Sequence, residues 1–400
     1  MFQFQFYLQK KSLLTVTLLL LSSSLYAEEW NARNDPQKMS EVGAHWFTSL
    51  FTGKELKSNF KDLPLAGKLD KGKMPWTDTY WPTYEGGIAN RWSDNSLSDK
   101  EKIVKASDLK TSLADLKKMS VQEIESLSPA EKWDLYRGDY NYTLTKSEIE
   151  RTRDVVENPE GSEWFGLCHG WAPAALNFEE PGCTSVQNKD GLTIKFFSSD
   201  IKALLTYYQG EACDPDAKRC FIGTRCEDTF DNKSFTASGR PESENNDINA
   251  GSFHIILANL IGKRSTGFIF DRTTDQPVWN QPVQGYSSKV LKQEKITEAS
   301  APAKRAAATV KEVTIESDVE WTGEIGAYTI PVNGVFENKM RHVTKYQYIL
   351  ELNKDNEIIG GRWISANYPD FLWTREAGDM SKSPLFKELK KLYKKSLSGK

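Results

Sequence analysis

The sequence predicts an α+β fold with a mainly helical N-terminal part and a β-rich C-terminal part. Helix start signals recur between residues 99 and 137, where Ser128 and Glu131 form a capping box. Short apolar runs bounded by turn residues recur after residue 250. The chain has 400 residues, of which 38% are hydrophobic. It can therefore bury a large core, and a disordered chain is excluded.

The first 27 residues have the pattern of a secretory signal peptide. Lys10 and Lys11 precede an apolar run over residues 13–21, and small residues follow up to Ala27. The alternative, a membrane anchor, needs about 20 apolar residues. We therefore expect a secreted protein, periplasmic or extracellular, without a membrane partner after cleavage. The net charge of −3 creates no positive field, so we expect no nucleic-acid partner.

An aromatic-rich segment covers residues 75–92 and includes Trp76 and Trp81. It has no clean helix or strand period, which indicates irregular backbone. Aromatic side chains on irregular backbone either line a cleft or pack across the core, and the sequence leaves both open.

Five cysteines follow, at Cys168, Cys183, Cys213, Cys220 and Cys226. The last four lie among loop-forming residues, where disulfides commonly fasten surface loops of exported proteins. Their pairing stays open. A zinc site is not expected, because the paired short spacing and a nearby histidine are both missing. Cys168 is then the unpaired thiol.

Cys168 is a candidate nucleophile. It lies at a predicted loop-to-helix junction, where the helix dipole favours a thiolate. A thiolate needs a base and a group that orients the base. His254, in a predicted strand over residues 253–257, is the best base, and Asp271 ends the next predicted strand. The alternative is that Cys168 and His254 are core residues.

The order Cys, His, Asp occurs in papain-like proteases, transglutaminases, amidases and acyltransferases. The unbroken string Val278-Trp279-Asn280-Gln281-Pro282-Val283 resembles the elicitor-peptide motif of the transglutaminase elicitor family, secreted oomycete proteins with bacterial relatives. Residues 165–174 are similar to the family's nucleophile segment, and residues 360–373 resemble its C-terminal strand region. Gln284 and Tyr286 depart from the elicitor peptide, which carries Arg and Phe there.

The resemblance implies a papain-like, transglutaminase-type catalytic core and a secreted protein-glutamine γ-glutamyltransferase. Cys168 would form a thioester with a glutamine side chain, His254 would carry the proton, and Asp271 would hold His254. The acyl group would then pass to a lysine amine or to water, so the expected partners are proteins bearing Gln and Lys. The alternatives are a papain-like cysteine protease or amidase, and a non-catalytic secreted elicitor or binding protein.

No metal site is predicted, and calcium is the one cofactor that the sequence leaves open, because residues 227–250 form a polar, acidic loop. Four tryptophans are candidates for walls of the substrate cleft: Trp171, Trp279, Trp76 and Trp81. The predicted segments are the signal peptide (1–27), the helical region with the aromatic segment (28–150), the catalytic core with disulfide-stapled loops (151–293), a linker (294–311) and a β-rich region ending in a helix (312–400).

Overall fold

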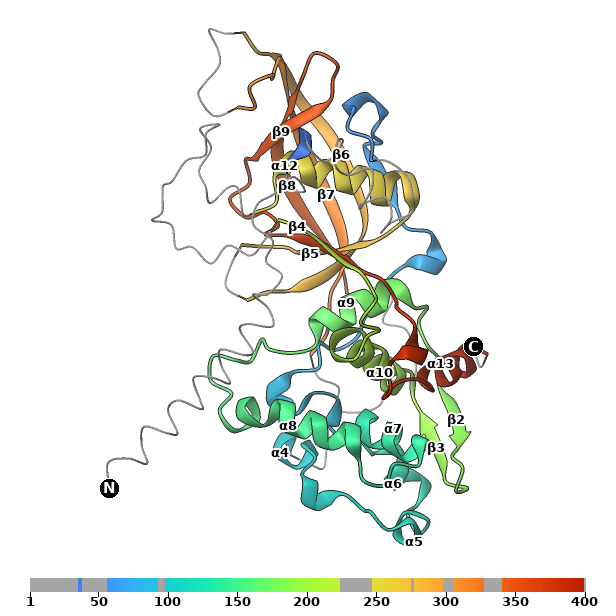
Figure 1. The fold of residues 1–400 in the computed structure, drawn as a ribbon. Coiled ribbons are helices and arrows are strands. Elements are labelled where there is room, and N and C mark those ends of the chain that lie inside the picture. The colour runs from blue at the N-terminus through green and yellow to red at the C-terminus, as the bar shows by residue number, and fades with distance from the viewer. Residues whose placement is uncertain are drawn as a thin grey trace, which may run out of the picture.

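The computed structural model describes residues 35–37, 56–92, 98–223, 247–274, 277–297, 305–326 and 340–398. The predicted signal peptide lies outside these residues. The described residues form both helices and strands (Figure 1), so the predicted mixture of helix and sheet is confirmed. Within the described residues, no helix is long and apolar enough to cross a membrane.

Most strands of the described residues belong to one antiparallel sheet in the order β4-β10-β5-β6-β7-β8-β9, and β1 pairs with β6. A separate hairpin, β2-β3, lies beside the helices (Figure 1). The strands are β1 (Ala66–Lys68), β2 (Thr184–Gln187), β3 (Thr193–Phe196), β4 (Arg219–Ile222), β5 (Phe268–Asp271), β6 (Asn280–Lys295), β7 (Lys311–Thr322), β8 (Arg341–Leu352), β9 (Ile358–Trp363) and β10 (Leu372–Arg375).

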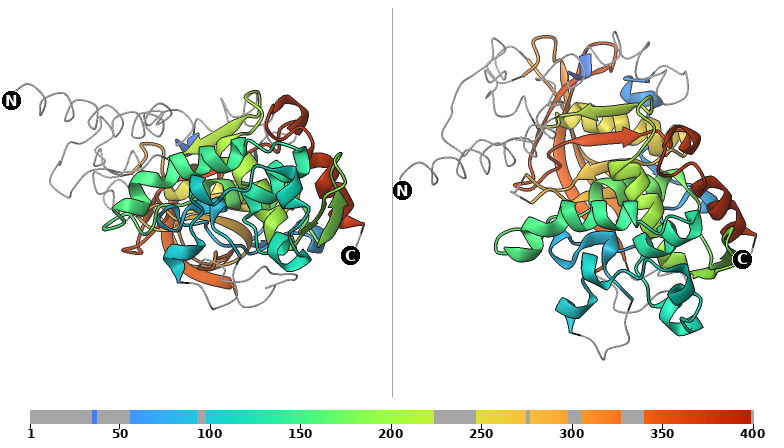
Figure 2. Two further views of the ribbon diagram at one scale, coloured as in Figure 1. Left: turned by 90° about the horizontal axis from the view of Figure 1, so that it is seen from below. Right: turned by 60° about the horizontal axis from the view of Figure 1, so that its bottom comes forward.

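The helices form two groups. One helix, α12, packs on β8 and β9, whereas the others gather at one end of the sheet, with α9 packed on α10, β5 and β6 (Figures 1 and 2). The helices are α4 (Asp99–Lys102), α5 (Leu113–Leu116), α6 (Val121–Glu125), α7 (Pro129–Arg137), α8 (Thr143–Glu157), α9 (Cys168–Asn177), α10 (Ser198–Glu211), α12 (Ala250–Ile256) and α13 (Leu389–Leu397).

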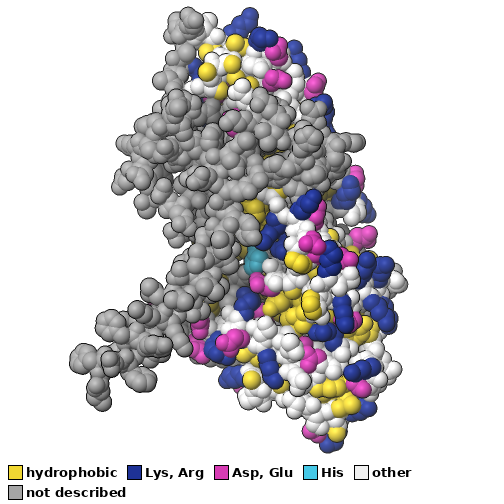
Figure 3. Space-filling model, in the orientation of Figure 1, with side chains coloured by type: hydrophobic (Ala, Val, Ile, Leu, Met, Phe, Trp, Pro, Cys, Tyr) yellow, Lys and Arg dark blue, Asp and Glu magenta, His cyan; other side chains and the backbone are white. Residues whose placement is uncertain are grey.

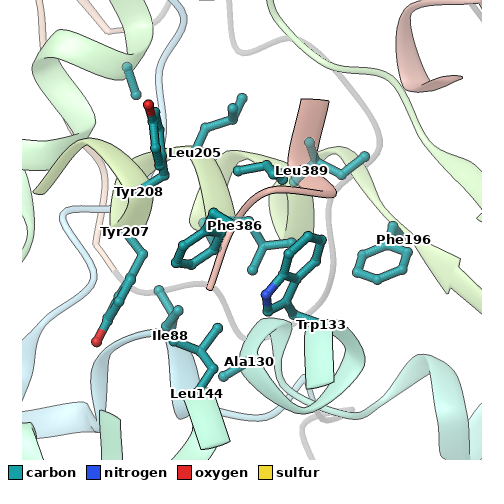
Figure 4. Packing of buried hydrophobic residues seen from close by; sticks show 14 of the residues in the cluster. Ile88, Ala130, Trp133, Leu144, Phe196, Leu205, Tyr207, Tyr208, Phe386 and Leu389 are labelled. Atoms are coloured by element: carbon teal, nitrogen blue, oxygen red, sulfur yellow. The ribbon is translucent and has the colours of Figure 1, made fainter. Parts of the chain in front are cut away.

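The two groups of elements have separate apolar cores. The helical core contains Trp133, whose ring stacks on Phe386 from the C-terminal segment at a centroid distance of 5.4 Å (Figure 4). The second core lies between α12 and the sheet and contains Phe253 and Tyr348. Ser128 caps α7 by accepting from the amide of Glu131, as predicted. On the face in Figure 3, cationic and anionic side chains are interspersed over the described surface.

Three segments test the elements expected from the sequence. Residues 253–257 form helix α12 and its continuation rather than a strand, because Asn249 caps the helix by accepting from the amide of Gly251. A short apolar run fits a buried helix as well as a buried strand. The segment 294–311 connects β6 to β7, which pair with each other along most of their length. The predicted hairpin near residues 345–364 is present as β8 and β9.

Candidate active site

Cys168 is the first residue of α9, and glycines on either side of it let the backbone approach its neighbours closely. A Cβ added to Gly166 would lie 2.4 Å from the carbonyl oxygen of Tyr80, and one added to Gly170 would lie 2.2 Å from that of Thr206. The amide of Leu167 also donates to Tyr80 O at 2.6 Å. The nucleophile segment is therefore fixed between the aromatic segment and α10.

The Cys168 thiol contacts the first residues of the elicitor-like motif. Its Sγ atom lies 3.8 Å from the carbonyl oxygen of Val278, and the side-chain amide of Asn280 donates to it at 3.4 Å. Trp373 Nε1 donates to Asn280 Oδ1 at 2.8 Å. Because an indole N–H can only donate, this bond fixes the amide with its Nδ2 toward sulfur.

Two carboxylates lie at the same end of the sheet. Asp271 ends β5 directly opposite Asn280, is fully buried, and its Oδ1 accepts from the amide of Trp279 at 3.3 Å. Glu324 follows β7, and its carboxylate accepts from the Gln281 side-chain amide. The strand pairing β5-β6-β7 thus brings an aspartate and a glutamate to the residues that contact the thiol.

The aromatic segment holds Glu324 in place. The amide of Ile325 donates to the carbonyl oxygen of Asp78 at 3.0 Å, and Thr79 pairs with Ile325 as an isolated parallel bridge. The same segment contacts the nucleophile loop through Tyr80. The aromatic segment therefore connects the residues after β7 with the nucleophile loop, although these are far apart in the sequence.

Burial dominates the electrostatics of the thiol. It raises the pKa of Cys168 to about 11, the hydrogen bonds from Asn280 lower it, and the charges of Glu324 and Asp271 raise it further. The expectation of a thiolate at the helix terminus is thus wrong for the free protein, because desolvation and two anions outweigh the helix dipole. Burial also raises the pKa of Glu324, which makes this carboxylate a stronger base than an exposed one.

The four predicted cleft tryptophans separate into one surface ring and three core rings. Trp279 is partly exposed and meets Tyr80 edge to face at 5.9 Å between centroids. Trp76, Trp81 and Trp171 are each at least 96% buried. Each indole N–H donates to a partner inside the protein: that of Trp76 to Phe178 O, that of Trp81 to Asp78 Oδ2 and that of Trp171 to Trp76 O. These three side chains are part of the helical core.

His254 is not brought to Cys168. It is fully buried on α12, where its Nδ1 lies 2.8 Å from the hydroxyl of Tyr348 and its ring lies 5.8 Å from that of Phe60. Burial lowers its pKa to about 4, with no contribution from the thiol. The predicted strand placed this imidazole at the wrong end of the sheet, because the residue belongs to a helix in the other core.

The histidine beside the nucleophile also points elsewhere. His169 Nε2 lies 3.1 Å from Glu211 Oε1 on α10, and its side chain is 41% exposed. Burial opposes ionisation of Glu211, but this hydrogen bond and nearby cations lower the pKa of Glu211 to about 2. His169 and Glu211 therefore form a surface pair that joins α9 to α10.

The predicted disulfides are not observed within the described residues. No disulfide joins two of the described cysteines, and Cys226 lies outside them. Cys213 illustrates the reason, because it is partly buried with its Sγ 3.3 Å from Gln209 Nε2 and 3.8 Å from Ala377 O. Its position under a loop makes it a packed thiol instead of a staple.

Sequence reasoning missed the polar partners of the thiol. From the sequence alone, the two amide side chains of the motif have no assigned role, whereas Asn280 contacts sulfur and Gln281 holds Glu324. Tyr80 was grouped with the aromatic segment, and Trp373 was noted only for the resemblance. No alternation of apolar and polar residues marks this end of β6, because its first seven residues are all buried.

No group of three or more His, Cys, Asp or Glu side chains in the described part of the chain is arranged to hold a metal ion. Most of the acidic loop considered for calcium, residues 224–246, lies outside the described residues. A role for calcium therefore stays a prediction.

A family model described as transglutaminase elicitor matches residues 48–388. The fold is similar to the crystal structure of the GP42 transglutaminase from Phytophthora sojae, with a TM-score of 0.62 and 23% identity over 93% of this chain and 100% of that chain. No curated protein matches. The structural likeness shows a shared fold, and the family match extends over most of the sequence. The chain is therefore a member of the transglutaminase elicitor family.

Proposed function

We propose that this protein is a secreted protein-glutamine γ-glutamyltransferase that acts through Cys168 with carboxylates as its acid-base partners. The observation that carries the proposal is the position of the thiol. It lies at the N-terminus of α9, hydrogen-bonded to Asn280 and within electrostatic range of Glu324 and Asp271. His254 is left out of the mechanism because it lies in the other core.

The first step transfers the thiol proton and forms a carbon–sulfur bond. Because the pKa of Cys168 is about 11, the sulfur is protonated at neutral pH and needs a base during attack. We assign Glu324, whose pKa burial raises and whose charge acts on the thiol, as the proton acceptor. The thiolate attacks the carbonyl carbon of a glutamine side chain, and the C=O electron pair moves to oxygen.

The developing oxyanion has donors available at the helix terminus. No side chain caps α9, and its first amide, that of Cys168, makes no bond to another described residue. Such an amide is free to donate to the oxyanion, and the Asn280 amide is a second donor in reach of sulfur. Collapse of the intermediate breaks the C–N bond. The leaving amine takes the proton from Glu324 and departs as ammonia, which leaves a thioester on Cys168.

A lysine amine then attacks the thioester carbon, the C–S bond breaks, and the amine proton passes through the carboxylate to sulfur. The products are an isopeptide bond and the free thiol. Water in place of lysine gives deamidation. The buried thiol and the aromatic pair Tyr80 and Trp279 support a site that limits access of water and favours transfer to an amine.

The test is amine incorporation by the purified protein. A blocked glutamine peptide is incubated with a fluorescent primary amine, and the product mass is measured. We expect each product to carry the amine and to lack the mass of one ammonia. Cys168→Ala should lower the rate by about 10⁴-fold or more, because it removes the nucleophile. Cys213→Ala, which removes a thiol outside the site, should retain full activity.

Other products support other functions. New peptide termini with the same dependence on Cys168 would indicate a papain-like protease. Biological effects that persist unchanged in Cys168→Ala, without amine incorporation by the native protein, would indicate a non-catalytic elicitor or binding protein. Loss of activity in a chelator and its recovery with Ca²⁺ would establish calcium dependence.

A further inference from the structure

A pocket of about 230 Å³ lies beside the C-terminal half of α9, outside the set of residues that surround Cys168. It is walled by α9, by the turn before β5 and by the end of β10 with the residue after it. Its lining residues are Lys73, Pro173, Leu176, Asn177, Ser265, Thr266, Gly267, Ile269, Thr374, Arg375 and Glu376. None of them has a role in the mechanism proposed above.

Arg375 is the unusual group in this pocket. It is partly buried, its Nε atom has no hydrogen-bond partner in the described structure, and none of the described carboxylates forms an ion pair with it. Across the β10-β4 pair it lies directly opposite Arg219. Two like charges in this position destabilise a sheet. Burial and Arg219 lower the pKa of Arg375, whereas the Cys213 side chain, its hydrogen-bond partner, raises it. An arginine held in this way favours an anion as its partner.

The other charged groups around Arg375 do not occupy the place that an anion would take beside it. Lys73 adds a second cation to the lining; its Nζ lies 3.2 Å from Asp70 and donates to Ser265 O at 3.1 Å. Glu376 is the one carboxylate in the lining, and its Oε2 accepts from the amide of Lys218 at 3.1 Å. Glu211 on α10 interacts with Arg375 only at longer range. The lining therefore has a net positive charge.

Part of the lining is an apolar wall, with Pro173 and Leu176 on α9 and Ile269 on β5. At about 30 Å³ per water molecule, the pocket has the volume of about eight waters, more than one isolated oxyanion requires. We propose that this pocket binds a small carboxylate that carries a short aliphatic chain. Arg375 and Lys73 bind the carboxylate, and the chain packs on the apolar wall.

Such a ligand contacts two elements whose other ends form the candidate active site. Cys168 begins α9 and Asp271 ends β5, whereas the pocket lies against Leu176 and Ile269 of the same two elements. Binding therefore stabilises the packing of α9 on β5 and raises the melting temperature by mass action. The proposal concerns binding alone, so it stands or falls independently of the transferase activity.

Isothermal titration calorimetry of the full chain with three probes separates the effect of the ligand's charge on binding from that of its shape. Isovalerate has both the carboxylate and the branched chain, isovaleramide has the same shape without charge, and inorganic phosphate has the charge without the chain. We expect saturable binding of isovalerate, and binding at least about tenfold weaker for isovaleramide and phosphate. Phosphate binding tighter than isovalerate, or equal binding of acid and amide, would overturn the proposal, as would no saturable binding of isovalerate.

Variants locate the site. Arg375→Gln should weaken isovalerate binding by at least about tenfold, Lys73→Gln should weaken it less, and the nearby exposed variant Lys71→Gln should leave it unchanged. Unchanged affinity in folded Arg375→Gln would show that isovalerate binds elsewhere. If Arg375→Gln fails to fold, Lys73→Gln decides the question, because the preference for acid over amide must fall in that variant if the pocket binds the carboxylate.

Discussion

Cys168 and His254 are both buried on helices that pack against the same sheet, yet their surroundings differ in kind. Cys168 lies at a helix end and meets the polar first residues of β6 and the carboxylates at the ends of β5 and β7. His254 lies within α12 and faces the aromatic core, where Tyr348 is its hydrogen-bond partner. The comparison teaches that a helix N-terminus at the ends of central strands brings polar and charged groups around one side chain, whereas a buried polar side chain within a helix is surrounded by the core.

The strongest test of this difference substitutes, one at a time, the carboxylates beside the thiol and the histidine in the other core. Glu324→Gln and Asp271→Asn keep the side-chain shapes but remove the charges beside the thiol, so each should lower kcat/KM for amine incorporation by roughly 10²-fold or more. His254→Phe should leave kcat/KM of the folded protein near normal, because the imidazole is outside the site. Steady-state kinetics at fixed pH measures all three.

Glu320→Gln is the matched control, because Glu320 is a carboxylate on β7 that pairs with Lys68 at the surface. It should have normal kinetics. An inactive His254→Phe that keeps its melting temperature, together with an active Glu324→Gln, would restore the Cys-His-Asp assignment and refute the carboxylate mechanism.

The second prediction concerns acid stability. Burial lowers the pKa of His254 to about 4, whereas an unfolded histidine has a pKa near 6.5, so below pH 6.5 the unfolded chain binds a proton that the folded chain excludes. His254 therefore contributes stability that is complete above about pH 6.5 and is lost as the pH falls toward 4. The expected loss is about 3 kcal/mol of unfolding free energy. Urea unfolding at several pH values measures it.

Other groups oppose this trend, so the comparison with His254→Phe is needed. Burial raises the pKa of Asp134 to about 7, and this carboxyl stabilises the folded state as the pH falls. Because the variant keeps Asp134, the difference between the two stability curves isolates His254. Parallel curves for the native protein and the variant would contradict the prediction.

A smaller effect is expected from the partner of His254. Its hydrogen bond to Tyr348 continues through Ser317, 2.8 Å from the tyrosine hydroxyl, to Ser288, 2.7 Å from Ser317. Tyr348→Phe leaves buried polar atoms without this partner, which should lower the unfolding free energy by about 2 kcal/mol with an unchanged kcat. Denaturant titration and kinetics on the same preparation check both parts. A fall in kcat with unchanged stability would instead connect this network to catalysis.

The sequence predicted the capped helix α7, the C-terminal hairpin and the strand that ends at Asp271, whereas the role of Cys168 as a nucleophile stays a prediction. Each of these three elements depends on a local signal, such as a capping box, a turn or a short apolar run. It could not predict the position of Glu324, because that residue reaches the site through β7 pairing and through the contact of Ile325 with Asp78. It placed His254 in a strand because a short apolar run fits both a helix and a strand. The order of Cys168 and His254 along the chain also does not give the distance between them in the fold.

The smallest effect is expected from Trp373, which contacts the site through Asn280 and not through the thiol. Trp373→Phe keeps an aromatic ring to stack on Phe221, whose centroid is 5.4 Å away, but removes the N–H that fixes the Asn280 amide. The amide then turns more freely, and its hydrogen bond, which lowers the pKa of Cys168, is made less often. Alkylation of Cys168 by iodoacetamide should shift to higher pH, and kcat/KM should fall about fivefold, the value of one hydrogen bond.

Phe221→Leu, which loosens the stack but keeps the N–H, should leave the alkylation profile in place. Because the free energy of unfolding reports packing and the alkylation profile reports orientation, a Trp373→Phe protein that loses only stability would make Trp373 a core residue like those around His254.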